Sequence, residues 1–359
     1  MSIISRYVLK EFFKLLFLTS LSLVLIYMLV DFFEKIDNFI EAGLNWNTVA
    51  WFFLMSIPNV FFLIAPVAIL VAILISMGLL ARNSEIVALK ASGVSLYRIS
   101  VPLLVASLGL SVLLFMLSDS VIPYTSAQVN QIWNVQVEGQ DGHKSGIKKD
   151  VWFRDKTNVY NFKSFDRRSG LIDGISMFVF GDRFHLLQRI EAVAASLEKG
   201  KWVLYDGMVK SYLSDGQISV EFFTEHPIKL SRIPDEVGEE PRSSNEMSAL
   251  DLWRWIHVME EGGYDPSRYL VDLNMKFSFP FICAIMTIIG LPIAFWKEKG
   301  GGIALGIGVG VGLSFCYLVF LGLSRALGYS GLLPPIASAW LPNTLFMILG
   351  FSFFSFVKQ

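Results

Sequence analysis

The chain has 359 residues, of which 53% are hydrophobic, 14% aromatic and only 17% charged. Soluble globular chains carry about a quarter charged residues, so this composition indicates an integral membrane protein. The formal net charge of −1 excludes a basic protein built to neutralise nucleic-acid phosphates, and we expect no nucleic-acid partner.

Long apolar runs predict six membrane spans, since a span requires roughly 20 mostly apolar residues. In chain order they are Phe12–Phe33, a run from about Val49 to Leu80, Ile99–Val121, Leu273–Phe295, Ile303–Leu327 and Ile336–Val357. The second run contains Pro58 and Pro66 and is longer than a bilayer requires. It therefore predicts a kinked helix that projects beyond the membrane.

Lysine and arginine are concentrated in alternate connections between these runs. They occur at the N-terminus, after the second and fourth runs and at the C-terminus, as Arg6, Lys10, Lys14, Arg82, Lys90, Arg98, Lys297, Lys299 and Lys358. The first and fifth connections contain only Lys35 and Arg325. Because short cytoplasmic loops carry the excess of positive charge, this pattern predicts that both termini are cytoplasmic.

The connection after the second run reads "ARNSEIVALKASG" and predicts a short, capped helix. Asn83 suits the N-cap, Glu85 suits the positive end of the helix dipole, and Gly93 suits a left-handed C-cap. Ile86, Leu89 and Lys90 are spaced to share one face, while Arg82 and Glu85 point elsewhere. Two interpretations stay open, a solvated loop or a docking helix in which Glu85 contacts a cytoplasmic partner.

A polar region with several strand-like segments separates the third and fourth spans. Turn signals between these segments are typical of a sandwich or jelly roll, and the topology places this region outside the cytoplasmic membrane. A helix is expected to start at Ser248 and return the chain to the membrane. We divide the chain into residues 1–124 with three spans, an outer all-β domain at residues 125–266, and residues 267–359 with three further spans.

No residue cluster in the sequence predicts a catalytic or metal site. The four histidines, at positions 143, 185, 226 and 257, lie in the outer region without ligand spacing, and Cys283 and Cys316 lie within apolar runs. Gly302, Gly306 and Gly310 recur every four residues, which favours close helix packing. No Gly-Lys-Ser/Thr follows these glycines, so any ATP must be hydrolysed by another protein.

Four ionisable residues near the outer ends of the spans are candidates for lipid binding: Lys35, Asp119, Lys276 and Arg325. Charged residues at membrane depth are costly and are often functional. One interpretation is anchoring at the membrane interface. The other is that some of them line a cavity that receives a lipid with charged head groups.

Several residue patterns in both membrane halves resemble one family. They are Ser5-Arg6-Tyr7 with Lys10, the segment from Leu80 to Glu85 leading into Gly93, Asp119 with Pro123, Arg268-Tyr269 with Lys276 and Pro280, and Pro334-Pro335 through Leu341-Pro342. On these residues the chain resembles the LptF/LptG (YjgP/YjgQ) permeases of the lipopolysaccharide-export ABC transporter. The C-terminal proline pattern favours the LptG-like branch over its LptF-like paralogue.

The resemblance implies that the connection after the second span is a coupling helix bound in a groove of a cytoplasmic ABC ATPase dimer. Its coupling residues would be Arg82, Ser84, Glu85, Leu89 and Gly93, with Glu85 as a key contact. The chain itself would be a non-catalytic permease that binds no cofactor, because ATP and Mg²⁺ belong to the ATPase.

The resemblance also implies further partners in a bacterial inner membrane. An LptF-like paralogue would form a cavity with this chain between their first and fifth spans, a single-span LptC-like protein would insert beside the first helix, and a periplasmic LptA-like bridge would receive the lipopolysaccharide. Strand residues that could shield the acyl chains, or form an ordinary sandwich core, are Val159, Phe162, Met177, Val179 and Trp202.

The sequence departs from the family where basic residues are expected at the outer end of the first span. Glu34, Ile40 and Glu41 occupy those positions, with Lys35 nearby, and no basic residue follows shortly after Pro123. Two other functions stay open. A permease of another envelope-lipid or lipoprotein ABC exporter usually has fewer spans, and a membrane-bound lipid-modifying enzyme requires an interfacial cluster of carboxylates or histidines.

Overall fold

The computed structural model describes residues 3–138, 147–155, 158–166, 171–181, 185–198, 201–212, 217–228, 243–261, 264–296 and 303–356. Some residues used in the sequence analysis lie outside these ranges: His143, Lys297, Lys299, Gly302 and Lys358. The chain divides into two compact units. The helical unit comprises Met1–Trp133, Ser243–Trp253 and Ser267–Gln359, and the strand unit comprises Asn134–Arg242 and Arg254–Pro266.

Helices account for nearly all of the helical unit. They are α1 (Ile3–Glu41), α2 (Trp46–Arg82), α3 (Glu85–Ala91), α4 (Leu96–Met116), α5 (Ile122–Gln131), the start of α6 (Ala249–Glu261), α7 (Ser267–Ser278), α8 (Ile282–Trp296), α9 (Ile303–Tyr329) and α10 (Pro335–Phe356). The residues of α6 after Trp253 belong to the strand unit. Short π-helical or 3₁₀ turns join some of them: η1 (Leu117–Val121), η2 (Ile132–Val137), η5 (Ser244–Glu246) and η6 (Phe279–Phe281).

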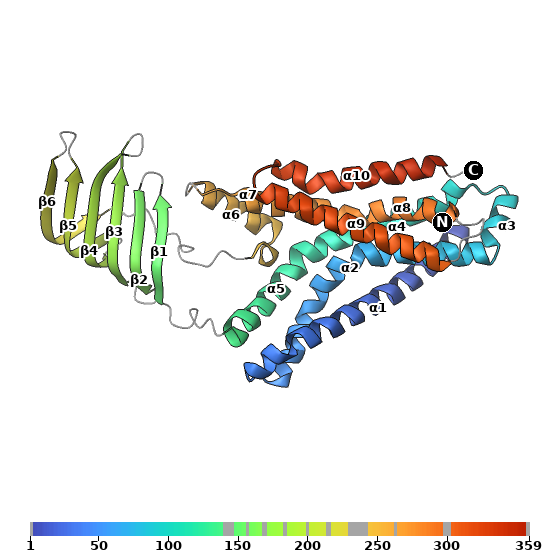
Figure 1. Cartoon of the computed structure of the whole chain (residues 1–359), viewed down its shortest axis with the longest axis horizontal. Coiled ribbons are helices and arrows are strands. Elements are labelled where there is room, and N and C mark those ends of the chain that lie inside the picture. The colour runs from blue at the N-terminus through green and yellow to red at the C-terminus, as the bar shows by residue number, and fades with distance from the viewer. Residues whose placement is uncertain are drawn as a thin grey trace. The chain divides into compact units, whose positions relative to one another are not determined.

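Six of these helical stretches are long and apolar enough to cross a membrane, which confirms the six expected spans. α1 has 39 residues and α2 has 37, so both exceed the roughly 20 residues that a bilayer requires. The third stretch continues as helix from Leu96 to Val137, beyond residue 125 where the composition changes. Both chain ends lie near α3, at the same end of the helical unit (Figure 1).

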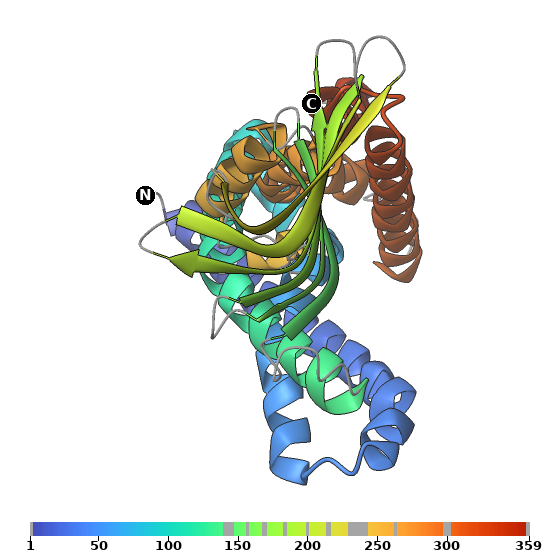
Figure 2. The ribbon, with the colours of Figure 1, turned by 90° about the vertical axis from the view of Figure 1, so that its left-hand side faces the viewer.

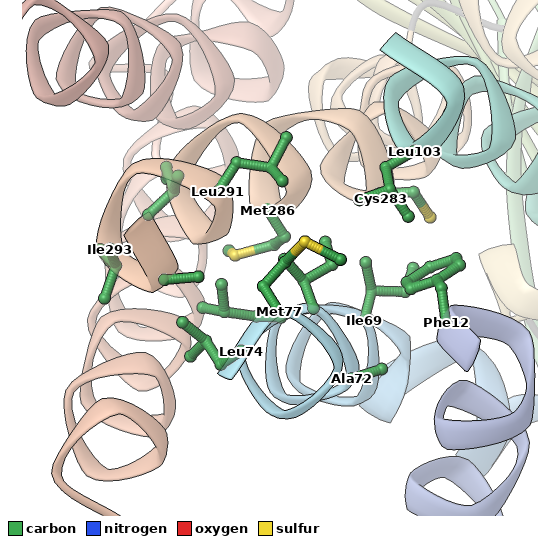
Figure 3. Close-up of a cluster of buried hydrophobic side chains, with 14 of the residues drawn as sticks. Phe12, Ile69, Ala72, Leu74, Met77, Leu103, Cys283, Met286, Leu291 and Ile293 are labelled. Carbon is green, nitrogen blue, oxygen red and sulfur yellow. The ribbon is translucent and has the colours of Figure 1, made fainter. Parts of the chain in front are cut away.

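α2 forms the centre of the helical unit. Its second half contributes Ile69, Leu74 and Met77 to a buried cluster with Phe12 of α1 and Met286 of α8 (Figure 3). On the α9 side, a Cβ built on Gly310 would lie 2.3 Å from the Leu74 side chain. Glycine at this position therefore permits the close helix approach that the repeated glycines predicted.

A 3₁₀ turn, η6, interrupts the fourth span between α7 and α8. Ile282 after this turn donates its N–H within the turn rather than to Ser278, which leaves the Ser278 carbonyl without its α-helical partner. The Asn343 side-chain amide donates to that carbonyl at 2.6 Å, and Tyr317 donates to the Asn343 oxygen at 2.7 Å. A buried polar chain thus joins α9 and α10 to the break in the fourth span.

The strand unit contains one antiparallel sheet, which confirms an inserted all-β domain. Its strands are β1 (Ile147–Asp155), β2 (Asn158–Asp166), β3 (Leu171–Phe180), β4 (Leu186–Glu198), β5 (Lys201–Tyr212) and β6 (Ile218–Ile228). Each strand pairs with the next in the order β1 to β6. Among the described residues this connectivity is a meander, which is simpler than the two Greek keys of a closed jelly roll.

The strands bend midway along their length (Figure 2). At this level the register leaves one row of residues unpaired across the whole sheet: Asp150, Lys163, Gly174, Val193, Asp206 and Thr224. Asp150, Gly174 and Asp206 in this row have positive φ angles of 53°, 63° and 48°. Glycine adopts such angles freely and aspartate tolerates them better than most residues.

This bend row reverses which residues of each strand face inward. On β3, for example, Ile172 and Ile175 are both buried although an uninterrupted strand would point them to opposite faces. Residues from both sides of the bend row form one apolar cluster, so the sheet folds along the row over its own apolar face. Phe162, Met177 and Trp202 belong to this cluster and Val179 packs against it.

Gly207 lies beside the bend row and has no room for a side chain. A Cβ there would lie 2.2 Å from the Glu191 carbonyl oxygen and 2.5 Å from the Phe223 ring. We expect Gly207→Ala to destabilise the strand unit by about 1–3 kcal/mol through overpacking. Protease-detected unfolding of the full chain in detergent measures this, with the exposed Val220→Ala on β6 as the control. Equal midpoints for the two variants would contradict the prediction.

Candidate functional site

α3 lies between α2 and α4 and ends in a Schellman motif. Gly93 has a φ of 84°, its N–H donates to the Lys90 carbonyl at 2.9 Å, and the N–H of Val94 donates to the Leu89 carbonyl at 3.0 Å. These bonds satisfy carbonyls that the helix end would leave open. The left-handed glycine predicted at this end is therefore confirmed.

The start of α3 differs from the prediction by one residue. The N-cap is Ser84, with a φ of 59° and no side-chain capping bond, rather than Asn83. α2 extends through Arg82, and the Asn83 N–H donates to carbonyls of that helix. The Asn83 side-chain amide donates instead to the Glu85 carboxylate at 3.4 Å.

One face of α3 packs into the helical unit. Ile86 is fully buried in the main apolar cluster, and Leu89 packs against the same cluster. These contacts bind α3 to the ends of the spans, because removing them would return apolar surface to water. Ile86 and Leu89 therefore share the inner face that their spacing predicted.

The opposite face of α3 is open and is built from small side chains. Ser84, Val87, Ala88 and Ala91 are all exposed, and their spacing of i, i+3, i+4 and i+7 makes one helical stripe. Val87 is 55% exposed. Sequence reasoning missed this residue, although the stripe can be read from the spacing once the inner face is assigned.

Glu85 lies at the border between the two faces and is half-buried. Its carboxylate accepts a hydrogen bond from the Asn83 side-chain amide at 3.4 Å. Arg82, the last residue of α2, is exposed beside it. The short helix thus offers a carboxylate, a neighbouring guanidinium and an apolar stripe at one end of the helical unit.

The opposite end of the helical unit contains the four candidate lipid-binding residues. One of them, Lys276, donates a hydrogen bond to a backbone carbonyl where the third span departs from α-helical hydrogen bonding. In the π-helical turn η1, the expected donor to the Ser118 carbonyl is residue 123, which is a proline without an N–H. The Lys276 ammonium group donates to the Ser118 carbonyl at 3.0 Å instead.

Asp119, the next residue of η1, binds the segment that returns from the strand unit. Its Oδ1 accepts a hydrogen bond from the N–H of Ala249, the first residue of α6, at 2.6 Å. Ser248 caps the same helix by accepting the Asp251 N–H at 3.1 Å, which confirms the helix start expected there. The Asp119 side chain therefore connects the third span to the start of α6 by a hydrogen bond.

Arg325 on α9 pairs with a residue that sequence reasoning did not single out. Its Nη2 and Nε lie 2.6 and 3.1 Å from the Asp272 Oδ1 on α7. The same carboxylate accepts hydrogen bonds from Tyr329 of α9 and Ser244 of η5. Asp272 is only 5% exposed, and this network compensates its desolvation.

Lys35 on α1 has a local partner. Its ammonium group lies 2.7 Å from the Asp31 carboxylate and above the rings of Phe52 and Trp133, 5.2 and 5.7 Å from their centroids. All four candidates therefore have intramolecular contacts, and lipid binding by them stays a prediction. In the part of the chain that the structure describes, no group of three or more His, Cys, Asp or Glu residues could hold a metal ion.

The Asp272 network predicts a clear difference between two carboxylates. We expect Asp272→Ala to destabilise the helical unit by about 1–3 kcal/mol, since it leaves Arg325, Tyr329 and Ser244 without a charged acceptor. The Asp31→Ala control removes a local i,i+4 pair worth roughly 0.2–0.5 kcal/mol. Thermal unfolding of the detergent-purified chain compares the two, and a smaller loss for Asp272→Ala would contradict this assignment.

Comparison with known proteins agrees with this architecture. A family model described as "Lipopolysaccharide export system permease LptF/LptG" matches residues 6–355. The chain is 23% identical over 354 residues to the lipopolysaccharide export system permease protein LptG of Escherichia coli strain K12, covering 97% of this chain and 96% of that protein. It is 24% identical over 352 residues to the Haemophilus influenzae protein of the same name, with 96% of each covered.

The match includes both membrane halves and the inserted sheet. Both relatives are named LptG, in agreement with the branch that the C-terminal prolines favoured. The chain therefore belongs to the LptF/LptG family of lipopolysaccharide export permeases.

Proposed function

We propose that this chain is the permease half of an ABC transporter that extracts lipopolysaccharide from the outer leaflet of the bacterial inner membrane. Its partners are a cytoplasmic ABC ATPase dimer, an LptF-like paralogue, a single-span LptC-like protein and a periplasmic LptA-like bridge. ATP and Mg²⁺ are bound by the ATPase, and this chain has no catalytic role. Membership of the LptF/LptG family supports this proposal.

The orientation follows from positive charge. α3 and both chain ends lie at one end of the helical unit (Figure 1). The same end carries Arg6 and Lys10 near the start of α1, Arg82 at the end of α2 and Arg98 near the start of α4. The positive-inside rule assigns this end to the cytoplasm. The strand unit, inserted between the third and fourth spans, is then periplasmic.

The observation that carries the proposal is the open stripe of α3. Val87 is exposed between Ala88 and Ser84 on a helix whose opposite face is buried, so α3 presents a small apolar stripe to its surroundings. Small side chains let a second surface approach the helix closely. The stripe therefore suits a partner groove, with Glu85 and Arg82 at its edge for charged contacts.

The lipid path is assigned to the least buried spans. Of the six spans, the first and fifth, formed by α1 and α9, have the smallest buried share. A cavity between these helices and those of the paralogue would place apolar walls around the acyl chains. Coupling then requires that the two nucleotide states of the ATPase contact α3 differently, because only a differential contact can shift the cavity.

Removal of the Glu85 carboxylate tests docking. We expect Glu85→Ala to abolish or strongly reduce co-purification of the ATPase from native membranes, with insertion and yield of the permease unchanged. Glu11→Ala is the control, since Glu11 is a carboxylate near the same end of the helical unit. Retention of the ATPase by Glu85→Ala at the control level would refute docking through this residue.

The open stripe makes a second, independent prediction. Val87→Asp adds a charge to an exposed position, so folding should tolerate it, but a partner groove would have to desolvate that charge. We expect loss of the ATPase and retention of the paralogous permease in the same pull-down. If the chain is purified alone in every variant, including wild type, a membrane-bound lipid-modifying enzyme becomes the better hypothesis.

A further inference from the structure

The first turn of α6 exposes two large apolar side chains. Leu250 is 56% exposed and Trp253 is 50% exposed, whereas Leu252 between them is fully buried and Ile256 one turn later is 2% exposed. Leu250 and Trp253 are three positions apart, so they are neighbours on the helix surface, away from the buried face. Both belong to the helical unit.

The exposed side chains in the second half of α6 are mainly polar. Arg254, His257 and Glu260 are exposed, and the His257 Nδ1 lies 3.2 Å from the Glu260 Oε2. Val258 is the exposed apolar residue of this half, and at 39% it is less exposed than Leu250 and Trp253. The open apolar surface of α6 is therefore concentrated in its first turn.

Hydrogen bonds fix the first turn of α6 and the segment before it to the ends of two spans. The Ala249 N–H donates to Asp119 of η1 at 2.6 Å, and the Ser244 hydroxyl donates to the Asp272 carboxylate of α7. Met247, between these two contacts, is only 4% exposed. The level of this turn along the spans is therefore set by the helical unit.

Asp119 lies about one bilayer thickness from the other end of the third span. An α-helix rises about 1.5 Å per residue, so Asp119 in η1 lies roughly 30 Å from Arg98 near the start of α4, which is the thickness of a hydrocarbon core. Met116 and Val121, on either side of Asp119, are 59% and 41% exposed. The apolar surface of this span thus continues to the level at which α6 begins.

A tryptophan and a leucine at this level suit the membrane interface. The indole ring is apolar and its N–H can hydrogen-bond to water or to lipid head groups, which is why tryptophan is enriched at both membrane boundaries. In water, the two exposed side chains would retain an apolar surface, and immersion in the leaflet removes this cost. The same lipid layer that covers Met116 and Val121 can cover Leu250 and Trp253.

We propose that Leu250 and Trp253 form an interfacial anchor, in which both side chains enter the phospholipid leaflet at the outer ends of the spans. They contact the boundary between acyl chains and head groups. This inference depends on the six spans and on the contacts of α6, and is independent of ATPase docking and of the transported lipid. Because α6 continues into the strand unit, the anchor fixes the depth at which the return helix leaves the membrane.

Quenching by lipids measures the depth of each position in the full chain. The background is Cys316→Ser, because Cys316 is exposed while Cys283 is fully buried and protected from labelling. Leu250→Cys, Trp253→Cys and the control His257→Cys are labelled with a nitrobenzoxadiazole fluorophore in nanodiscs of phosphatidylethanolamine and phosphatidylglycerol. We expect lipids with a nitroxide on the upper acyl chain to quench positions 250 and 253, and aqueous iodide to quench position 257.

A conservative variant tests the native side chain without a label. In nanodiscs that contain brominated phosphatidylcholine, the absolute loss of tryptophan emission should be smaller for Trp253→Phe than for wild type, since the variant lacks the quenched indole. Trp202→Phe is the control, because Trp202 is only 8% exposed and belongs to the apolar cluster of the strand unit. Its loss of emission should equal that of wild type.

Each outcome decides the proposal. Stronger lipid quenching at positions 250 and 253 than at 257, with the reduced loss in Trp253→Phe, supports the anchor. Quenching of positions 250 and 253 by iodide alone would mean that water covers the first turn, and protection from both quenchers would mean that a protein such as the paralogous permease covers it. Either result overturns the anchor, and equal lipid quenching at all three positions overturns its restriction to the first turn. Loss of ATPase docking in the Glu85→Ala variant leaves these results unchanged.

Discussion

A carbonyl oxygen inside a bilayer has no water from which to accept a hydrogen bond, and this constraint shapes the helical unit. The third and fourth spans both depart from α-helical hydrogen bonding, at η1 and η6. At each break a side chain from another helix donates to a backbone carbonyl: Lys276 donates to Ser118, whose π-helical donor would be the proline at position 123, and Asn343 donates to Ser278. Side-chain hydrogen bonds from other helices therefore join the spans at the places where their backbones depart from α-helical hydrogen bonding.

The lack of water also affects charged side chains. It explains why charged residues near the outer end were candidates for lipid binding in the sequence although their partners lie within the chain. Asp119 binds the start of α6, and Asp272 gathers Arg325, Tyr329 and Ser244 from two other segments. A buried charge must be compensated, and here the compensating groups come from the chain itself. At the other end of the unit, the half-buried Glu85 carboxylate and the exposed stripe of α3 can still contact a partner.

Periodicity and composition were sufficient for the six spans, the inserted strands and the glycine end of α3, because each depends on local pattern. Long-range partners were not predictable in this way. Nothing near Asp272 in the sequence points to Arg325, which is 53 positions away, and the start of α3 moved to Ser84 because α2 continued through Arg82. The sequence did not predict the bend row, because its members, such as Lys163 and Val193, have no residue type or local pattern in common. They are related only by the pairing of their strands.

The bend row also constrains how this domain can change during evolution. Its six residues form a line only because the strands keep one common register from β1 to β6. Insertion or deletion of a single residue within any strand would displace that strand's member of the line and turn inward residues outward on one side. Length variation among relatives should therefore be confined to the connections between strands, while the distance from each strand's ends to the row is retained.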